Sequence, residues 1–348
     1  MDIRNRNWRK TLKLAGVAAA LCGSAHAFAG EPVSRTLCIY DPIGANGFIY
    51  QSFQDYITQA LNWGVRFDPK PYTDEDVAVS DFKSGKCDAV EITGVHNIQF
   101  VKFAGSLDMV GGLQTYPEEH SAIMAISGPK AAKYMTAGDF EVAGVAPGGK
   151  VFLFARHKDN LSSMQKAAGK KVAVLSFDKQ ATTFANVAGA APVPATIASF
   201  GPMFNNGSVE YAYAPSFAYK ALELYKGLGT DGGVADYVLG MLSLQVDVHK
   251  SKFPADFGQT SRTWVAGNMW DTAIGRIQKT DSEVPDKFWA HVDAERTKSY
   301  AELLVKVRQG LWDEKWYDHD MQHMLKKIRC KSNPSEAECS QPSEGGPT

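Results

Sequence analysis

Five cysteines are the first residues of this 348-residue chain whose chemistry can be weighed against their spacing. No C-x2-C pair or cysteine–histidine pair with zinc-ligand spacing occurs, so a metal role is not favoured. With Cys22 set aside as part of a leader, Cys38, Cys87, Cys330 and Cys339 form an even set, which suits disulfides in an oxidising compartment. Three pairings are possible. We favour Cys330 with Cys339, which would close a short loop, and therefore Cys38 with Cys87.

The other motifs that could indicate a metal, cofactor or catalytic site are weak. His319 and His323 are four residues apart and would share one helix face, where they could hold a metal ion. A solvated terminal helix explains them better, so no metal site is predicted. Residues 227–233 contain G-x-G-x-x-G, but a helix-like run precedes them, whereas a dinucleotide site needs a strand there. No G-x-S-x-G and no protease-like Cys/His/Asn order occurs, so neither an enzyme nor a cofactor is predicted.

The N-terminus has the pattern of a secretory signal peptide. Five basic residues precede an apolar run at residues 14–21, and small-x-small cleavage patterns follow at residues 25–29. The run is too short to span a bilayer. We therefore predict a signal peptide over residues 1–29 and export of a soluble protein to the periplasm.

Charge and composition narrow the class of protein. Without the leader, 32 basic and 37 acidic side chains remain, a net charge of about −5. Nucleic-acid-binding proteins need basic patches, so no nucleic-acid partner is predicted. Hydrophobic residues make up 44% of the chain, enough for one or two cores, and the length favours two lobes.

The elements that must position a site begin with a β-α-β-α-β order over residues 36–94. Strands are expected at residues 36–40, 65–72 and 88–93, and the intervening runs have helical spacing and end at glycines. In a doubly wound order the first and third strands are neighbours, which would bring Cys38 close to Cys87. Ligands bind outside the carboxyl ends of such strands. That rule places the 41–48 loop and residues 91–94 at the mouth of the lobe.

A second α/β lobe is expected further along the chain. We predict strands at residues 118–127, 151–156, 171–176 and 209–213, a long strand at residues 234–248, and helices from residue 257 to residue 328. Residues 330–348 are rich in Ser, Pro and Glu and are predicted to form a mobile tail.

Three segments in this order resemble a known family. They are TDEDVAVSDFKSGKCDAVEITG, NLSSMQKAAGKKVAV and AGAAPVPATIASFGPMFNNGSVEYAYAP. They are similar to the periplasmic solute-binding proteins of TRAP transporters, the DctP-like family, over residues 36–254. The resemblance implies an α/β, two-lobe periplasmic-binding-protein (venus-flytrap) fold with mixed sheets and a helical C-terminal region. The expected organisation is a first lobe from residues 30–126 and 217–256, a second lobe from 127–216 and 257–310, and a C-terminal helix at 311–329.

The chain departs from this family at the position that usually holds the ligand's carboxylate. The family has an arginine in the strand after the Gly-Lys-Lys turn, where this chain has Ala173, and Ala214 replaces an asparagine before a later proline. Either the ligand is not a simple organic acid, or another base such as Arg156 binds it. We therefore expect a ligand that is neutral, aromatic or weakly acidic.

The candidate ligand-binding residues lie at strand ends and in the predicted cleft loops. Aromatic side chains with a polar tip suit an apolar pocket with a few directed hydrogen bonds. The candidates are Asn46, Phe48, Glu91, Thr93, Arg156, Ser176, Asp178, Tyr211, Tyr213 and Phe217.

The function expected from these observations is capture of a small solute by a monomer that closes around it and delivers it to membrane permease subunits. Two alternatives remain open: a periplasmic sensor that binds a ligand for a membrane receptor, and an exported enzyme on the same scaffold. A permease or a fused kinase encoded beside this protein would separate the first two.

Overall fold

The computed structural model of the protein describes residues 31–348, so the predicted signal peptide, residues 1–29, lies outside the described residues. None of the helices in the described part is long and apolar enough to span a membrane. The strands are β1 (Val33–Tyr40), β2 (Val65–Tyr72), β3 (Ala89–Thr93), β4 (Thr136–Ala137), β5 (Phe140–Ala155), β6 (Lys171–Leu175), β7 (Ala191–Ala195), β8 (Tyr211–Pro215), β9 (Gly233–Ala235), β10 (Gly240–His249) and β11 (Trp289–Ala290).

These strands join one mixed sheet in the order β2-β1-β3-β10-β5-β8-β6-β7. β1 runs parallel to β2 and β3, whereas β10 is antiparallel to both β3 and β5. β5 is also antiparallel to β8, beside which β6 and β7 run parallel. We call β2-β1-β3-β10 the first half and β8-β6-β7 the second half. β5 lies between the halves and pairs with both, and the β-α-β-α-β prediction for residues 36–94 is confirmed.

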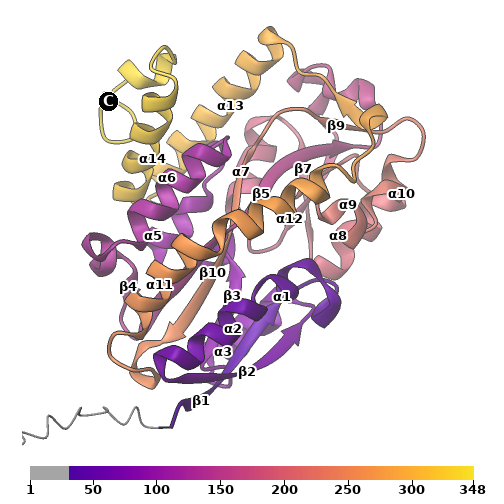
Figure 1. Ribbon diagram of the computed structural model, residues 1–348. Helices are drawn as coiled ribbons and strands as arrows, with labels where there is room; N and C mark the ends of the chain where they lie inside the picture. The colour runs from indigo at the N-terminus through magenta and orange to yellow at the C-terminus, as the bar shows by residue number, and fades with distance from the viewer. Residues whose placement is uncertain (1–30) are drawn as a thin grey trace, which may run out of the picture. The chain divides into compact units, whose positions relative to one another are not determined.

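The helices cover the faces of this sheet, and α11 and α12 cross the long strands β5 and β10 (Figure 1). The α-helices are α1 (Phe48–Ser52), α2 (Gln54–Ala60), α3 (Glu75–Lys83), α4 (Gly94–Asn97), α5 (Lys102–Gly105), α6 (Tyr116–Ser127), α7 (Lys179–Val187), α8 (Ile197–Asn205), α9 (Ala218–Ala221), α10 (Leu224–Leu228), α11 (Phe257–Asn268), α12 (Trp270–Asp281), α13 (Ala294–Asp313) and α14 (His319–Ser332). Short 3₁₀ turns join them, among them η1 (Gly44–Asn46), η2 (Leu61–Trp63), η3 (Ser106–Asp108) and η9 (Ala337–Ser340).

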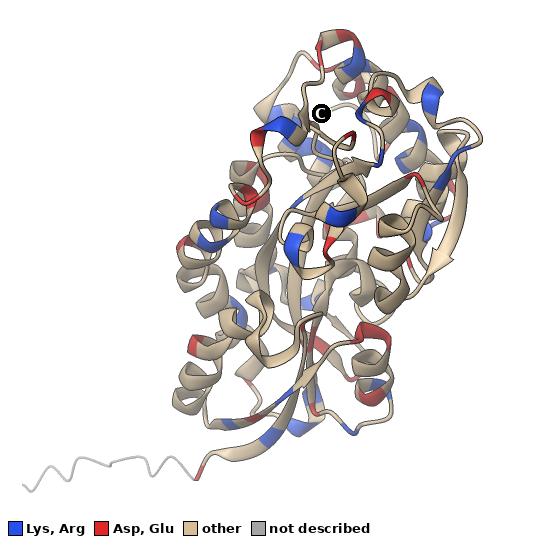
Figure 2. Cartoon of the chain, turned by 90° about the vertical axis from the view of Figure 1, so that its right-hand side faces the viewer, with Lys and Arg blue, Asp and Glu red and all other residues tan. Residues whose placement is uncertain are grey.

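The apolar core is divided between the two halves of the sheet. In the first half, Cys38 and Val90 face one cluster while Leu37 and Ala89 face another on the opposite side. In the second half, alternate residues of β5, β6 and β8 supply a further pair of clusters in the same way. Strands covered on both faces are apolar at nearly every position. Accordingly, Figure 2 shows charged positions mainly on helices and loops, and the central strands mostly uncharged.

The packing of three segments differs from the predicted lobe bounds. Residues 140–146 and 257–269 contribute Val142, Val145 and Val265 to the first-half clusters, although they were assigned to the second lobe. Residues 217–228, assigned to the first lobe, pack in a second-half cluster. The reason is that β5 pairs with both halves of the sheet, so sequence order does not follow the division of the core.

Two strand predictions were wrong. Residues 118–127 belong to helix α6, which starts at a capping box in which Thr115 and Glu118 bond reciprocally through side chain and backbone. This Thr-x-x-Glu pattern is visible in the sequence and outweighs the strand-like apolar residues that follow. The long strand expected at residues 234–248 is divided into β9 and β10. The strand expected at residues 151–156 is present, but as the last part of β5, which begins at Phe140.

The C-terminal region also differs from its prediction. The single helix expected over 311–329 is two helices, α13 and α14, separated where Lys315 adopts a positive φ of 53°. The predicted mobile tail, residues 330–348, is folded back onto α14: Cys339 and Glu344 are both buried. Apolar residues of α13 and α14, such as Leu311 and Met321, pack into the first-half core.

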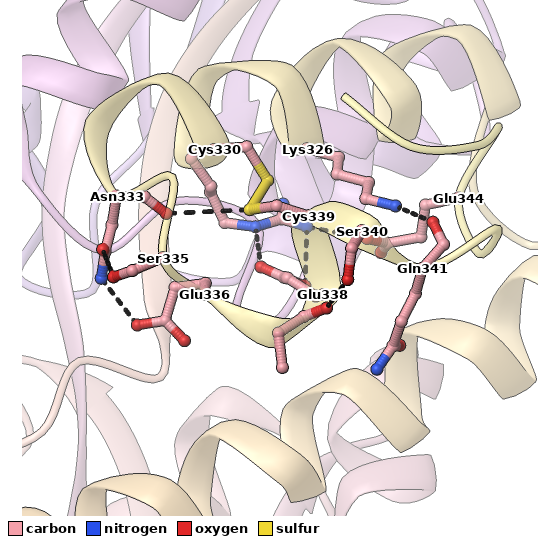
Figure 3. The surroundings of a disulfide bond; sticks show 12 residues. Lys326, Cys330, Asn333, Ser335, Glu336, Glu338, Cys339, Ser340, Gln341 and Glu344 are labelled. Carbon is pink, nitrogen blue, oxygen red and sulfur yellow. Dashed lines mark hydrogen bonds and ion pairs between the residues drawn. A yellow bond between two sulfur atoms is a disulfide. The ribbon is translucent and has the colours of Figure 1, made fainter.

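Both predicted disulfides are confirmed. Cys38 and Cys87 are joined, with a Cα–Cα distance of 5.9 Å, because β1 and β3 are neighbours that pair Cys38 with Val90. Cys330 and Cys339 are joined across 5.6 Å and close the loop that starts the tail (Figure 3).

Candidate ligand-binding site

A cavity of about 150 Å³ is lined by residues from both halves of the sheet. Strand ends supply much of its wall: Tyr40 ends β1, Thr93 ends β3, Leu175 ends β6, and Gly240 begins β10. The carboxyl ends of parallel strands are where open α/β sheets bind ligands. Most of the lining is apolar, and its polar side chains are Tyr40, Glu75, Thr93, Asp108, Asp178, Gln180 and Tyr213.

Glu75 is held at the cavity wall by the end of β3. It lies in the first turn of α3, and its Oε1 accepts hydrogen bonds from the Thr93 backbone N–H (2.7 Å) and hydroxyl (2.8 Å). Its Oε2 lies 3.5 Å from Nδ1 of His96. The His96 ring stacks on Phe177 at 3.9 Å between centroids, which joins the first half of the sheet to the second beside the cavity.

Asp108 enters the cavity wall from η3. Its carboxylate accepts hydrogen bonds from the backbone N–H of Ser243 (3.0 Å) and from the Ser243 hydroxyl (2.5 Å). Burial, opposed by these bonds, raises the pKa of Asp108 to about 7. A Cβ on Gly94 would lie 2.6 Å from the Asp108 carboxyl group, so a glycine is required at that position for the close approach.

Asp178 and Tyr213 form a polar pair on the second-half side. Asp178 caps α7 by accepting from the Ala181 N–H at 2.9 Å, and its other oxygen accepts from the Tyr213 hydroxyl at 2.8 Å. Burial raises the pKa of Asp178 to about 6. Both the burial and the nearby Asp178 carboxyl raise the pKa of Tyr213, so the phenol stays protonated.

Another carboxyl group, that of Glu91, is buried near Glu75. Glu91 is fully buried, and neither of its oxygens has a hydrogen-bond partner among the described residues. Burial, and then repulsion from Glu75 and Asp41, raise its pKa well above the usual range. Tyr40 lines the cavity, and its own burial raises the pKa of its hydroxyl group. Repulsion from Glu75, Asp41 and Glu91 raises this pKa further.

Of the predicted ligand-binding residues, the structure places Thr93, Asp178, Tyr213 and Phe217 on the cavity wall. Phe48 stacks on Phe217, with ring centroids 5.7 Å apart, so it supports the wall from behind.

Other predicted residues lie away from this cavity. Asn46 and Ser176 are solvent-exposed. Arg156 follows the end of β5, three residues and about 10 Å along the strand from Leu153, which lines the cavity. Tyr211 pairs with Ala155, next to Arg156, and donates a hydrogen bond to the Asn160 carbonyl at 3.2 Å. Both residues lie beyond Leu153 and Tyr213, a pair on β5 and β8 that marks the limit of the cavity wall on these strands.

Sequence reasoning missed Glu75, Asp108 and Gln180. Glu75 was visible only as part of an acidic helix start, and Asp108 lies in a short 3₁₀ turn without a motif. Gln180 accepts from the Val110 N–H (3.0 Å) and the Tyr317 hydroxyl (2.6 Å), which ties α7 to the first half of the sheet. Partners so far apart in the sequence leave no local signal.

The histidine pair has other partners. His319 stacks on Trp312 at 3.6 Å between centroids, and His323 bonds through Nδ1 to the Glu344 carbonyl oxygen at 2.9 Å. Among the described residues, no group of three or more His, Cys, Asp or Glu side chains is arranged to hold a metal ion.

Comparison with known proteins decides the family. A family model described as "Solute-binding protein AdeT 1/2" matches residues 64–344. The chain belongs to this family of solute-binding proteins. It is 38% identical over 301 residues to the probable solute-binding protein AdeT1 of Acinetobacter baumannii, covering 86% of this chain and 98% of the relative. It is 22% identical over 235 residues to the probable solute-binding protein AdeT2 of the same organism, covering 68% of this chain and 98% of AdeT2.

Solved structures of other solute-binding proteins show the fold of this AdeT 1/2 family member. A TRAP periplasmic solute-binding protein from Desulfovibrio salexigens, with bound orotic acid, has a TM-score of 0.70 at 11% identity and covers 85% of this chain and 97% of its own. A TRAP protein from Ralstonia eutropha, with bound (S)-2-acetolactate, has a TM-score of 0.68 at 16% identity. The match covers 86% of this chain and 99% of the Ralstonia chain. The expected two-lobe fold with a mixed sheet is therefore confirmed.

Proposed function

We propose that this protein is exported to the periplasm, captures a small organic molecule in the cavity between the two halves of its sheet, and delivers it to a TRAP-type permease. The observation that carries the proposal is the cavity itself: a mostly apolar wall at strand ends, with a few oriented polar groups. Thr93, Asp178, Tyr213 and Phe217 are the predicted site residues that would contact the ligand. No catalytic step is assigned to the protein.

Fold and family support this role. The structural neighbours with TM-scores near 0.7 are described as TRAP periplasmic proteins with small organic molecules bound, among them orotic acid, succinate and malonate. Size also supports it, because a cavity of about 150 Å³ admits a group as large as a benzene ring.

The test is native mass spectrometry of protein purified from the periplasm without denaturation, with a variant that fills the cavity. Leu175 lines the cavity, so Leu175→Trp should remove any retained small molecule. Leu61→Trp, at an exposed position on η2, is the matched control and should retain it. A released compound added at 100 times its Kd should stabilise wild type by about 2.7 kcal/mol, a rise of several degrees in Tm.

Delivery to a permease needs a separate readout. Cells lacking the protein should take up the identified ligand more slowly than wild-type cells, and the wild-type gene should restore uptake while the Leu175→Trp gene should not. Binding without any effect on uptake would support a sensing role instead. Equal ligand retention by wild type and Leu175→Trp would contradict this cavity as the site.

A further inference from the structure

The ionisable acidic and basic side chains that line the cavity wall are all acidic. Three carboxyl groups, those of Glu75, Asp108 and Asp178, line it, and of the described residues on its wall none is lysine, arginine or histidine. We infer that the cavity selects a small amphipathic organic cation, an apolar body carrying an ammonium group. The inference rests on the proposed function and names the class of its solute.

The bases near these carboxyl groups have other partners outside the cavity wall. His96 adjoins the wall beside Glu75. Its Nδ1 lies 3.5 Å from Oε2 of Glu75, and its Nε2 lies 3.4 Å from Oδ1 of Asp76. Lys179, next to Asp178 in the sequence, pairs with Glu314. Lys150, next to Val151, lies over the ring of Tyr116.

The Glu75 end is the place for the ammonium group. Thr93 occupies one oxygen of Glu75 with two hydrogen bonds, while Oε2 accepts no hydrogen bond from the described residues and lies 3.5 Å from His96. Glu75 is 4% exposed, and the unpartnered Glu91 lies behind it with both oxygens buried. The repulsion from Glu75 and Asp41 that helps to raise the pKa of Glu91 is the repulsion that a bound cation would relieve.

The rest of the wall suits an apolar body. Phe177, Phe200, Tyr213 and Phe217 present aromatic side chains, and Leu175 and Met241 add aliphatic surface. Aromatic faces also attract cations, most strongly where water is excluded.

A carboxylate ligand would face the opposite situation. It would lose its hydration inside an apolar cavity without gaining a basic partner, and it would be repelled by the carboxylates already there. Ala173, at the position where the resemblance implies a carboxylate-binding arginine, is fully buried in the apolar core of the second half. The cavity therefore differs in charge from one built for organic acids.

The test compares three probes of similar shape on the exported chain by isothermal titration calorimetry: 2-phenylethylammonium, 2-phenylethanol and phenylacetate. The cation should bind at least about tenfold more tightly than the alcohol, since hydrogen bonds to charged groups are the stronger ones. Phenylacetate should bind more weakly than the alcohol. The Glu75→Gln variant should lose about 10- to 100-fold in cation affinity and little in alcohol affinity.

Controls separate charge from folding. Glu295→Gln changes an exposed carboxylate on α13 and should leave all three affinities unchanged. If Glu75→Gln fails to fold, Asp178→Asn provides the second variant, with a smaller loss of cation affinity expected.

Three outcomes would overturn the inference: equal affinity for the cation and the alcohol, tighter binding of phenylacetate, or no binding of any probe at millimolar concentration. The proposed function is judged separately from the retained molecule. A neutral or anionic compound that is released from wild type but not from Leu175→Trp would keep the proposed function and refute the cation. If no molecule is retained by wild type and no preference for the cation is found, the proposed function and the cation inference are both refuted.

Discussion

Several carboxyl groups of this protein are buried, and their burial changes the pH at which they ionise. Asp108, Glu91 and Glu119 are almost completely inaccessible to solvent, and burial raises the pKa of each. A buried carboxyl group costs least when it keeps its proton. The cavity and its surroundings are therefore a region whose charge changes near neutral pH, unlike the exposed carboxyl groups elsewhere.

At this scale we predict an unusual pH dependence from Asp108. Its folded pKa of about 7 is above the ordinary 3.8, so between these values the folded protein binds a proton that the unfolded chain releases. The stability it contributes is complete below about pH 4 and is lost as pH rises to about 7. Asp108→Asn does not titrate, so the free energy of unfolding of wild type relative to Asp108→Asn should fall by about 2–4 kcal/mol over that range.

Urea denaturation at pH 4.5, 5.5, 6.5 and 7.5 measures this difference. Asp271→Asn, an exposed change on α12, should run parallel to wild type at every pH. A wild-type minus Asp108→Asn difference that stays constant with pH would show that the pKa of Asp108 is not raised.

At the scale of the element, the C-terminal segment shows how a polar tail is held in place. Arg308 of α13 and Arg329 of α14 both contact Glu338 and Glu344 of the tail. Glu344 accepts from Arg308 Nε at 2.7 Å and from Arg329 at 2.8 Å, and it is 5% exposed. The disulfide shown in Figure 3 closes the loop that leads to these glutamates.

We predict that Glu344→Gln destabilises the protein by about 3–5 kcal/mol, because it leaves two buried guanidinium groups short of a partner. The two arginines hold the pKa of Glu344 below its usual range despite its burial, so this contribution is present above pH 4.5 and is lost as pH falls through the lower folded value. Chemical denaturation at pH 7 measures it. Glu336→Gln, an exposed change in the same tail, should alter stability by no more than about 0.5 kcal/mol. Equal effects of the two changes would refute the buried ion pairs.

At the scale of the whole molecule, Pro32–Thr348 form one compact unit whose two halves meet at the cavity. β5 pairs with both halves, and three side-chain contacts join them nearby: the stack of His96 on Phe177, and the bonds that Gln180 accepts from Val110 and Tyr317. Such contacts can break and form as two lobes open and close.

We therefore predict that ligand binding draws the two halves together. Small-angle scattering should give a smaller radius of gyration after addition of the ligand identified from the purified protein. Leu175→Trp should show no change on the same addition, because its cavity is filled. An identical wild-type profile with and without ligand would contradict closure.

Local patterns in the sequence were enough for several features. The alternation of apolar runs and glycine-terminated helices determined β1, β2 and β3, and their order placed Cys38 beside Cys87. The Thr-x-x-Glu capping box at Thr115 is also a local pattern, but the apolar residues after it favour a strand. Thr93 and Asp178 could be expected near the cavity because Thr93 ends a strand and Asp178 lies three residues after one.

Only the tertiary structure decided the charge of the cavity and the position of Arg156. Glu75, Asp108 and Asp178 come from the start of α3, a 3₁₀ turn and the N-cap of α7, and the first and last are 103 residues apart. No short-range pattern in the sequence indicates that they meet. The pairing of β5 with β8 put Arg156 beyond Leu153 and Tyr213 of the cavity wall, and that pairing is settled by the whole topology. Sequence alone predicted a cavity at the ends of strands, because strand ends are local. Which charges face that cavity depended on packing between distant segments.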